Sequence, residues 1–276
     1  MMKWIDTHQH FWKYDADTYD WITEEMLAIR RDFLPEDLFS VLQENGVSAS
    51  IAVQANQTEA ETDWLLTLAD QYPFIAGVVG WVDLRSDQIK ERLEHYSQFP
   101  KLKGFRHVLQ GEDPAFMLQK DFLNGISYLH QYGFTYDILI FPKHLDASIK
   151  LVEQFPDQQF VIDHIAKPDI KHGSISNWKE GIEAISQYQH VCCKLSGMVT
   201  EADWANWTPE DMKPYLDVVV NSFGTDRIMF GTDWPVCLVA ADYEKWKSVI
   251  GEYFSSFPLS EQEKIFSKNA ERFYRI

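Results

Sequence analysis

The residues of this chain best suited to chemistry are two histidines near its start. His8 and His10 lie in the segment IDTHQHFW, residues 5–12. Because residues i and i+2 of a strand point the same way, both imidazoles should face one side at the strand's carboxyl end. Two such imidazoles can hold a metal ion, bind an anion or transfer protons. A short His-x-His triplet also occurs by chance as a solvated pair, so its meaning depends on a second polar site.

Asp233 provides that second site, in the segment GTDWP after the apolar run 227–231. If the strands form a closed barrel, the last strand lies beside the first, and Asp233 lies beside His8 and His10. A carboxylate close to imidazoles stays ionised and can act as general base on a water molecule. The alternative is that Asp233 only caps the turn before Pro235.

His164 and Arg106 also follow apolar runs that read as strands. His164 is predicted to join the catalytic group, with a buried core histidine as the alternative. Arg106, with His107 beside it, would bind a substrate carboxylate or carbonyl through paired N–H donors. A structural ion pair between Arg106 and a carboxylate such as Asp137 is the competing interpretation.

Aromatic side chains are dense near the same strand ends. Flat aromatic faces with polar rims suit sugar rings and small cyclic compounds, although ordinary core packing explains any single one equally well. The residues predicted to contact the substrate are Arg106, His107, Trp12, Trp21, Gln54, Trp81, Asp137 and Trp234.

Apolar runs rich in β-branched residues alternate with helical periodicity along the whole chain. The predicted strands cover residues 4–8, 50–54, 75–82, 102–107, 134–139, 159–164, 191–196 and 227–231. The predicted helices include residues 35–45 and helices starting at the caps Thr58 with Glu61, Thr208 before Pro209, and Ser260 with Glu263.

Eight such units in 276 residues match the size of a (β/α)₈ barrel. We therefore expect one α/β domain over residues 1–276, a distorted TIM-like barrel. An open doubly wound sheet is the runner-up, although the chain carries no G-x-G-x-x-G or phosphate-loop pattern. Most of the strands turn polar only at their carboxyl ends, and that end of a barrel carries the active site.

The formal net charge of −17 argues against nucleic acid or an anionic membrane surface as a partner. No continuous apolar stretch is long enough to span a bilayer, and no leader precedes the first strand, so we expect a soluble cytoplasmic protein. Three cysteines cannot all pair, which makes a disulfide scaffold or a thiolate zinc site improbable. The oligomeric state is not predicted.

Five motifs together resemble the amidohydrolase superfamily, and within it the amidohydrolase 2 branch of sugar-lactone and related lactone hydrolases. They are IDTHQHFW (5–12), LKGFRH (102–107), VIDHIAKP (161–168), KLSG (194–197) and MFGTDWP (229–235). The resemblance implies a distorted (β/α)₈ barrel that opens a cyclic ester, with Asp233 as base. A neutral sugar lactone such as L-fucono-, L-rhamnono- or L-galactonolactone is the implied substrate, opened to its hydroxy acid.

The metal set departs from that of the metal-dependent superfamily members, because the fifth strand offers Asp137 and no histidine. His8, His10 and Asp233, with His164 as a further candidate, could still hold one Zn²⁺. The branch also resembles enzymes that cleave lactones without metal, so either no cofactor or a single divalent ion is expected. The imidazoles and Arg106 could then polarise the carbonyl directly.

Two other functions remain open on the sequence. A metal-dependent decarboxylase of the same superfamily also begins with His-x-His and ends in a catalytic aspartate. A catalytically silent sugar-binding barrel would use the pocket without turnover. A serine nucleophile has less support, because Ser196 lacks the strand-turn-helix elbow of G-x-S-x-G, and Lys194 reads as a charge partner.

Overall fold

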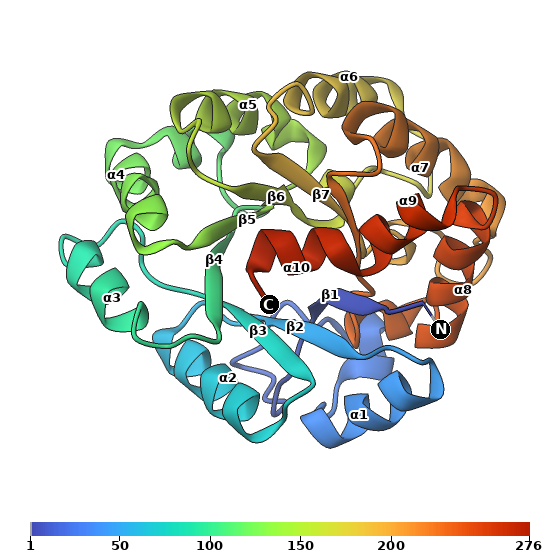
Figure 1. Ribbon diagram of the computed structural model, residues 1–276, viewed down its shortest axis with the longest axis horizontal. Coiled ribbons are helices and arrows are strands. Elements are labelled where there is room, and N and C mark those ends of the chain that lie inside the picture. Colours follow the sequence, from blue (N-terminus) through green and yellow to red (C-terminus); the bar gives the residue numbers. More distant parts are fainter. Residues whose placement is uncertain (1) are drawn as a thin grey trace.

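The computed structural model describes residues 2–276 and contains one parallel sheet of eight strands. The strands pair in the order of the chain, each with the next, around the centre of the molecule (Figure 1). They are β1 (Ile5–Gln9), β2 (Ala49–Val53), β3 (Ile75–Gly80), β4 (Leu102–Val108), β5 (Thr135–Leu139), β6 (Phe160–Ile162), β7 (Val191–Leu195) and β8 (Ile228–Phe230).

The sheet closes on itself where the end of β1 meets the residues that follow β8. Gln9 and Trp234 form a parallel bridge, the His10 N–H donates to the Trp234 carbonyl at 2.7 Å, and the Asp233 N–H donates to the His8 carbonyl at 2.8 Å. The closing contacts therefore involve residues that follow β8 rather than β8 itself, which distorts the barrel. The predicted distorted (β/α)₈ barrel is confirmed, and the open doubly wound sheet is wrong.

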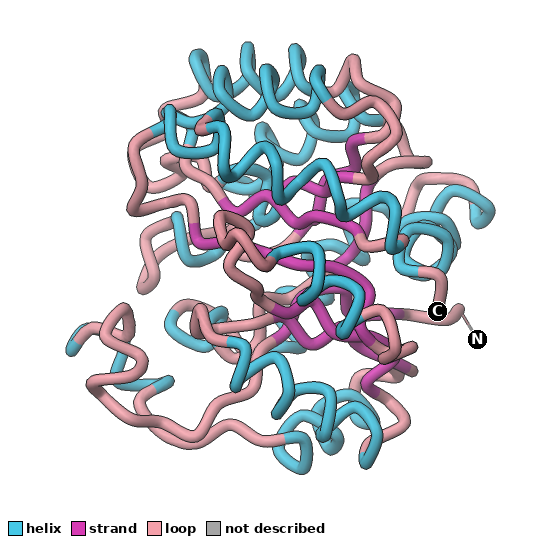
Figure 2. Tube along the Cα trace, turned by 90° about the vertical axis from the view of Figure 1, so that its left-hand side faces the viewer, coloured by secondary structure: helices cyan, strands magenta, loops and turns pink. Residues whose placement is uncertain are grey.

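Helices surround the strands on all sides (Figures 1 and 2). They are α1 (Pro35–Glu44), α2 (Glu59–Gln71), α3 (Ile89–Tyr96), α4 (Lys120–Leu129), α5 (Leu145–Gln154), α6 (Ser176–Ile185), α7 (Pro209–Phe223), α8 (Tyr243–Phe254), α9 (Leu259–Glu263) and α10 (Asn269–Tyr274). Short helical turns are η1 (Glu24–Ile29), η2 (Pro114–Leu118), η3 (His130–Tyr132), η4 (Pro142–His144), η5 (Asp163–Ala166), η6 (Val199–Glu201), η7 (Val236–Val239) and η8 (Lys264–Lys268). Within residues 2–276, no helix combines the length and apolarity needed to cross a membrane.

The predicted helix starts are only partly confirmed. Thr58 caps α2 by accepting the Glu61 N–H at 3.2 Å, but the Glu61 carboxylate bonds to the backbone before the helix, so only half of the expected capping box forms. α7 begins after Thr208 as predicted, with Pro209 in its first turn, and the Asp211 carboxylate accepts from the Thr208 N–H at 2.8 Å and from its hydroxyl at 3.1 Å. Ser260 is not a cap, because α9 already begins one residue earlier, after a proline.

The last helix, α10, closes the end of the barrel opposite the site described below (Figure 1). Phe273 and Tyr274 pack with interior strand residues such as Ile5 and Val161 in one apolar cluster. The Tyr274 hydroxyl extends beyond this apolar cluster and donates to Asp137 at 2.9 Å. The barrel interior is therefore apolar next to α10 and charged toward the carboxyl ends of the strands.

The three cysteines are buried free thiols. Cys192 belongs to the inner cluster beside α10, whereas Cys193 packs in the outer core between strands and helices. This agrees with the alternation of neighbouring strand residues between two faces.

Candidate active site

The two histidines of β1 converge on the aspartate that follows β8. The Nε2 atoms of His8 and His10 lie 3.2 Å apart. Asp233 Oδ1 lies 3.2 Å from His10 Nε2 and 3.8 Å from His8 Nε2. All three side chains are buried. The structure thus brings together the residues that the sequence places at opposite ends of the chain.

Asp233 has an unusual backbone conformation for a residue other than glycine, with φ of 64°. Its side chain turns toward the imidazoles, and Oδ1 also lies 3.8 Å from His164 Nε2. Burial alone would raise the pKa of this carboxyl, but the neighbouring His164 and His10 and the Lys167 ammonium outweigh it and lower the pKa below its usual value. Asp233 is therefore a carboxylate at neutral pH, which is the form a general base needs.

His164 reaches the cluster through a break in regular structure. β6 ends at Ile162, and His164 has φ of 53°, so the predicted strand to residue 164 is two residues too long. The ring is held by Ser196, whose Oγ lies 2.9 Å from His164 Nδ1. Gly197 leaves the space for it, because a Cβ there would lie 2.4 Å from His164 Nδ1.

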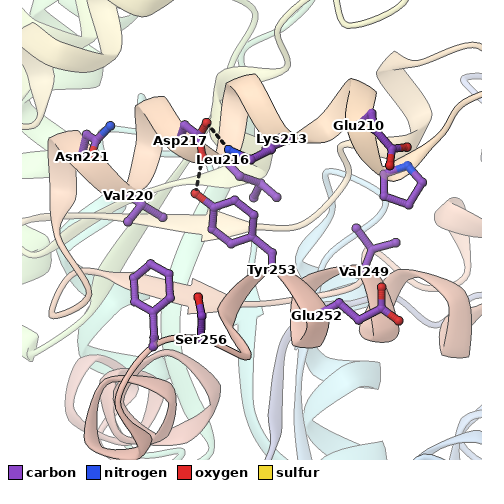
Figure 3. Close-up of a pocket in the computed structure, with 12 residues that line it drawn as sticks. Glu210, Lys213, Leu216, Asp217, Val220, Asn221, Val249, Glu252, Tyr253 and Ser256 are labelled. Carbon is purple, nitrogen blue, oxygen red and sulfur yellow. Dashed lines mark hydrogen bonds and ion pairs between the residues drawn. The ribbon is translucent and has the colours of Figure 1, made fainter.

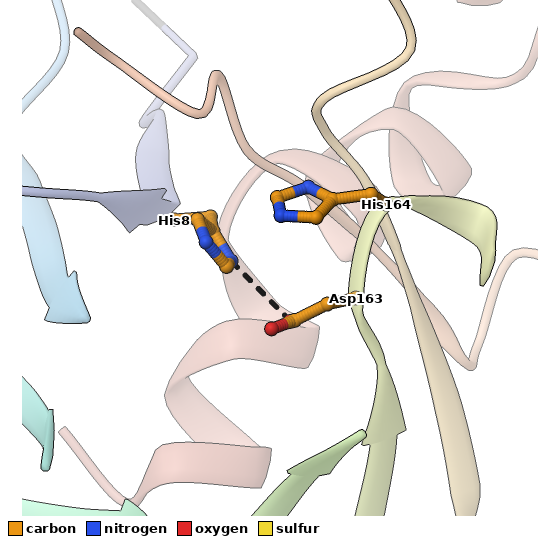
Figure 4. Close-up of side chains that lie close together, drawn as sticks. All are labelled: His8, Asp163 and His164. Carbon is orange, nitrogen blue, oxygen red and sulfur yellow. Dashed lines mark ion pairs between the residues drawn. The ribbon is translucent and has the colours of Figure 1, made fainter. Parts of the chain in front are cut away.

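A buried network of charges lies beneath the imidazoles. His8 Nδ1 lies 3.3 Å from Asp163 (Figure 4). The same nitrogen lies 3.2 Å from Lys194 Nζ. Lys194 bridges Asp163 at 3.0 Å and Asp137 at 2.5 Å, and Arg106 pairs with Asp163 at 3.2 Å. All five side chains are at most 4% exposed. Buried charges persist only when paired in this way, so the network holds the floor of the site rigidly.

The structural ion pair that was the alternative interpretation of Arg106 does form, but its carboxylate is Asp163 rather than Asp137. Asp163 forms the ion pair with Arg106, while Asp137 accepts hydrogen bonds from Lys194 and Tyr274. Asp137 is fully buried below the imidazoles, and so it is a partner of Lys194 rather than a substrate contact. The interpretation of Lys194 as a charge partner agrees with these contacts.

The donor set fits one divalent ion. Two ligands that lie about 2.0 to 2.1 Å from a tetrahedral Zn²⁺ are about 3.3 Å apart, close to the separations among His8, His10 and Asp233. Burial holds the pKa of His8 and of His164 well below the usual value, so both imidazoles are neutral and keep a lone pair. Arg106 Nη1, 3.2 Å from His8 Nε2, is the feature that weakens such a site, because it competes for that nitrogen.

A second candidate group consists of His8, Asp163 and His164 (Figure 4). Its carboxylate is already shared between Lys194 and Arg106. A divalent ion there would have to displace or lie against two cations, so the group with Asp233 is the better metal site.

A pocket of about 600 Å³ opens above the cluster at the carboxyl ends of the strands. His10, Arg106, His164 and Asp233 form part of its lining, and Trp21 lies at its rim with 37% of its surface exposed. The pocket also contains polar and aromatic residues that the sequence did not single out: Asp20, Asn56, Gln57, Gln110, Lys167, Thr200, Glu201 and Trp204. They lie in βα loops, and their position after a strand is the only sequence signal that could have found them.

Two of the predicted aromatic contacts belong to the core instead. Trp12 is fully buried and donates its indole N–H to the Arg31 carbonyl at 2.8 Å. Trp234 is 2% exposed, and its ring packs edge-on against Phe33 with centroids 5.2 Å apart. Both rings stabilise the long loop after β1, so packing explains them.

Three further predicted contacts support the site from outside the pocket. Gln54 is buried, donates to the Arg106 carbonyl at 3.2 Å and accepts from the Arg106 guanidinium through its own carbonyl, so it positions Arg106. His107 stacks on Phe116 with ring centroids 5.1 Å apart, and Trp81 donates toward it at 3.3 Å. Since neighbours in a strand point to opposite faces, Arg106 faces the barrel interior and His107 faces the helices.

A separate hollow of about 520 Å³ lies outside the barrel between α7 and α8 (Figure 3). Its polar groups bond to each other: Tyr253 and Lys213 each donate to Asp217 at 2.7 Å. Its lining comes from helices rather than from strand ends. The chemistry of the molecule is therefore assigned to the pocket above Asp233.

The fold and this pocket define a barrel enzyme whose ionisable groups gather at the carboxyl ends of the strands. A family model described as Amidohydrolase matches residues 5–276, so the chain belongs to the amidohydrolase family. The expected resemblance is thereby confirmed.

Two similar proteins named as lactonases align with nearly the whole chain. An L-fucono-1,5-lactonase of Burkholderia multivorans is 37% identical over 99% of this chain and 96% of the relative. An L-fucono-1,5-lactonase of Burkholderia ambifaria is 34% identical over 99% of this chain and 95% of the relative. A crystal structure of an amidohydrolase from Burkholderia multivorans with bound zinc superposes with a TM-score of 0.96, at 37% identity and 99% coverage of both chains.

Proposed function

We propose that this protein hydrolyses a neutral sugar lactone, of which L-fucono-1,5-lactone is the first candidate, to the open hydroxy acid. The observation that carries the proposal is the Asp233 carboxylate, held 3.2 to 3.8 Å from three imidazole nitrogens on the floor of the pocket. The full-length similarity to two proteins named L-fucono-1,5-lactonase supports it. Small lactone rings also suit a pocket of about 600 Å³.

In this mechanism Asp233 removes a proton from water, and the resulting hydroxide attacks the lactone carbonyl. Negative charge develops on the carbonyl oxygen, where the N–H groups of Arg106 and any protonated ring nitrogen of His8, His10 or His164 stabilise it. The proton held by Asp233 is then available to the departing ring oxygen. A single Zn²⁺ bound by His8, His10 and Asp233 would polarise the carbonyl and lower the pKa of the attacking water.

The charges of the pocket favour a neutral substrate over a dicarboxylate. Arg106 is paired with Asp163, and Lys167 is paired with Glu201. Asp20 adds a further acidic side chain to the lining. A substrate with two carboxylates needs cations that are not already neutralised. A polyhydroxylated ring needs only hydrogen-bond donors and acceptors, which the loops provide.

A pH-indicator assay over hexono- and pentono-lactones tests the proposal, with Asp233→Asn as the control. The parent is expected to release acid from L-fucono-1,5-lactone faster than the spontaneous rate, and the variant is not. Acid release by neither protein from any lactone would contradict the proposal. In that case, CO₂ release from aromatic carboxylates would favour the decarboxylase. Lactone binding without turnover would favour the catalytically silent sugar-binding barrel.

A further inference from the structure

The loop after β6 contains a left-handed turn made of residues with side chains. His164, Ile165, Ala166 and Lys167 have φ values of 53°, 49°, 62° and 48°. L-amino acids rarely adopt this conformation in succession, because Cβ then crowds the following carbonyl. The turn is held by the Lys167 N–H, which donates to the His164 carbonyl at 2.8 Å, and by the Trp178 indole, which donates to the Ile165 carbonyl at 2.6 Å. Strain of this kind gathers at functional sites.

The result of the turn is that Lys167 joins the pocket lining together with His164. The Lys167 side chain is only 13% exposed, and its ammonium donates to Glu201 and, at 3.4 Å, to Thr200 Oγ1. Glu201, in η6 after β7, is 19% exposed and also lines the pocket. Two loops from neighbouring strands therefore place an ammonium and a carboxylate side by side at the wall of the pocket.

This pair has capacity left for a ligand. The hydrogen bonds that Glu201 accepts from Lys167 and Thr200 both end on Oε1, so the lone pairs of Oε2 are available. An ammonium has three N–H donors, of which these contacts use two. An adjacent donor and acceptor match two neighbouring hydroxyl groups, since each hydroxyl both donates and accepts. Trp204 also lines the pocket and donates its indole N–H to the Thr200 carbonyl at 2.9 Å, and an indole ring suits the C–H groups of a sugar.

We propose that Lys167 and Glu201 bind two adjacent hydroxyl groups of the lactone and thereby select polyhydroxylated lactones over unsubstituted ones. This inference rests on the proposed lactonase function and names the residues that set its specificity. The pair lies beside the reacting groups rather than among them, so its contribution depends on the hydroxyls that the substrate carries. A site built to hydrogen-bond a hydroxyl discriminates strongly against a substrate that lacks it.

The competing explanation is that Lys167 acts only through its charge. Its ammonium lies close enough to Asp233 and His164 to influence their ionisation. A residue with only that role would affect every lactone equally, whether or not it carries hydroxyls. A comparison of substrates therefore separates the two roles.

The test compares the parent with Lys167→Met and Glu201→Gln on L-fucono-1,5-lactone and on δ-valerolactone, which has no hydroxyl groups. We expect kcat/KM for the sugar lactone to fall about 10- to 100-fold in each variant, as for a hydrogen bond to a charged group. On δ-valerolactone, the loss in kcat/KM should be at least about tenfold smaller than on the sugar lactone in each variant. Lys171→Met is the matched control, because Lys171 is an exposed lysine of the same loop.

A second readout does not depend on turnover. The inhibition constant of L-fucose, which has ring hydroxyls and no lactone carbonyl, should rise at least about tenfold in both variants and stay unchanged in the control. Equal losses on both lactones, or an unchanged inhibition constant for L-fucose, would overturn the assignment of the pair. A parent that hydrolyses no lactone contradicts the proposed function itself, which is a different result.

Discussion

The substitution Gly197→Ala tests whether close packing fixes the position of His164. A Cβ at residue 197 would lie 2.4 Å from His164 Nδ1 and 2.6 Å from its Cγ. Neither distance is possible for real atoms, so the imidazole must move or the loop after β7 must shift. The contact between His164 Nδ1 and Ser196 Oγ, 2.9 Å long, cannot survive such a movement unchanged.

Two separate energies contribute to the effect. Residue 197 has φ of 60°, and a side chain in this left-handed region costs about 1 to 2 kcal/mol. Overpacking against the buried ring adds about 1 to 3 kcal/mol. Gly46 provides a matched control, because it has φ of 64° and nothing lies within 4 Å of its Cβ position. Gly46→Ala should therefore lose only the backbone contribution, about 1 to 2 kcal/mol in free energy of unfolding. Gly197→Ala should lose both contributions, about 2 to 5 kcal/mol in total.

Urea unfolding and steady-state hydrolysis of L-fucono-1,5-lactone measure the two consequences. We expect kcat/KM of Gly197→Ala to fall about 10²- to 10³-fold, the usual cost of removing one group that stabilises the transition state. Gly46→Ala should keep the kcat/KM of the parent. Adding Gly197→Ala to His164→Ala should cause little further loss, because both changes remove the same group. A folded Gly197→Ala protein with nearly parental kcat/KM would refute the claim that His164 acts from this position.

Three further predictions concern pH, buried charge and metal. Burial raises the pKa of Glu61 from 4.5 to about 7 despite N–H donors from Asn56 and Ala55, so its proton binds more tightly in the folded state. The parent should therefore lose about 3 kcal/mol more stability than Glu61→Gln as the pH rises from 4 to 9, and equal pH dependence in urea unfolding would contradict this. Lys194→Met leaves the buried Asp137 carboxylate without its cation, removes one of the two cations beside Asp163, and should cost about 3 to 5 kcal/mol in free energy of unfolding; a loss below about 1 kcal/mol would mean that the charges are not mutually dependent. Prolonged chelation should lower the thermal midpoint and Zn²⁺ should restore it if the site holds an ion, and His10→Ala should abolish that restoration; recovery that persists in the variant would place the ion elsewhere.

The fold and the centre of the site were predictable because they depend on simple periodicities. Eight alternating units imply a barrel, and closure of a barrel brings its last strand to its first. This argument alone places Asp233 beside His8 and His10, as the structure has it. The position of His164 follows from its place at the end of an apolar run, even though the strand ends two residues earlier than predicted.

The residues that line the walls of the pocket were harder to predict from the sequence. His107 was predicted to contact the substrate together with Arg106, but neighbours in a strand face opposite ways, and only Arg106 reaches the interior. Trp12 and Trp234 were indistinguishable from ring-binding residues because the same aromatic side chains pack cores and line pockets. Lys167 reaches the pocket wall because of the left-handed turn over residues 164–167. The sequence gives no sign of this turn, since such turns usually contain glycine and this one has none.

The central claim is that Asp233 is the base that activates water. The most direct measurement is kcat of Asp233→Asn on L-fucono-1,5-lactone, with the free energy of unfolding measured alongside. The account predicts a loss of about 10²- to 10⁴-fold in kcat, because the amide cannot accept the proton. It also predicts a folded protein, since the amide has the shape of the carboxylate and can still hydrogen-bond to His10 Nε2. A kcat within about tenfold of the parent would contradict the assignment of Asp233 and move the base to another residue of the cluster.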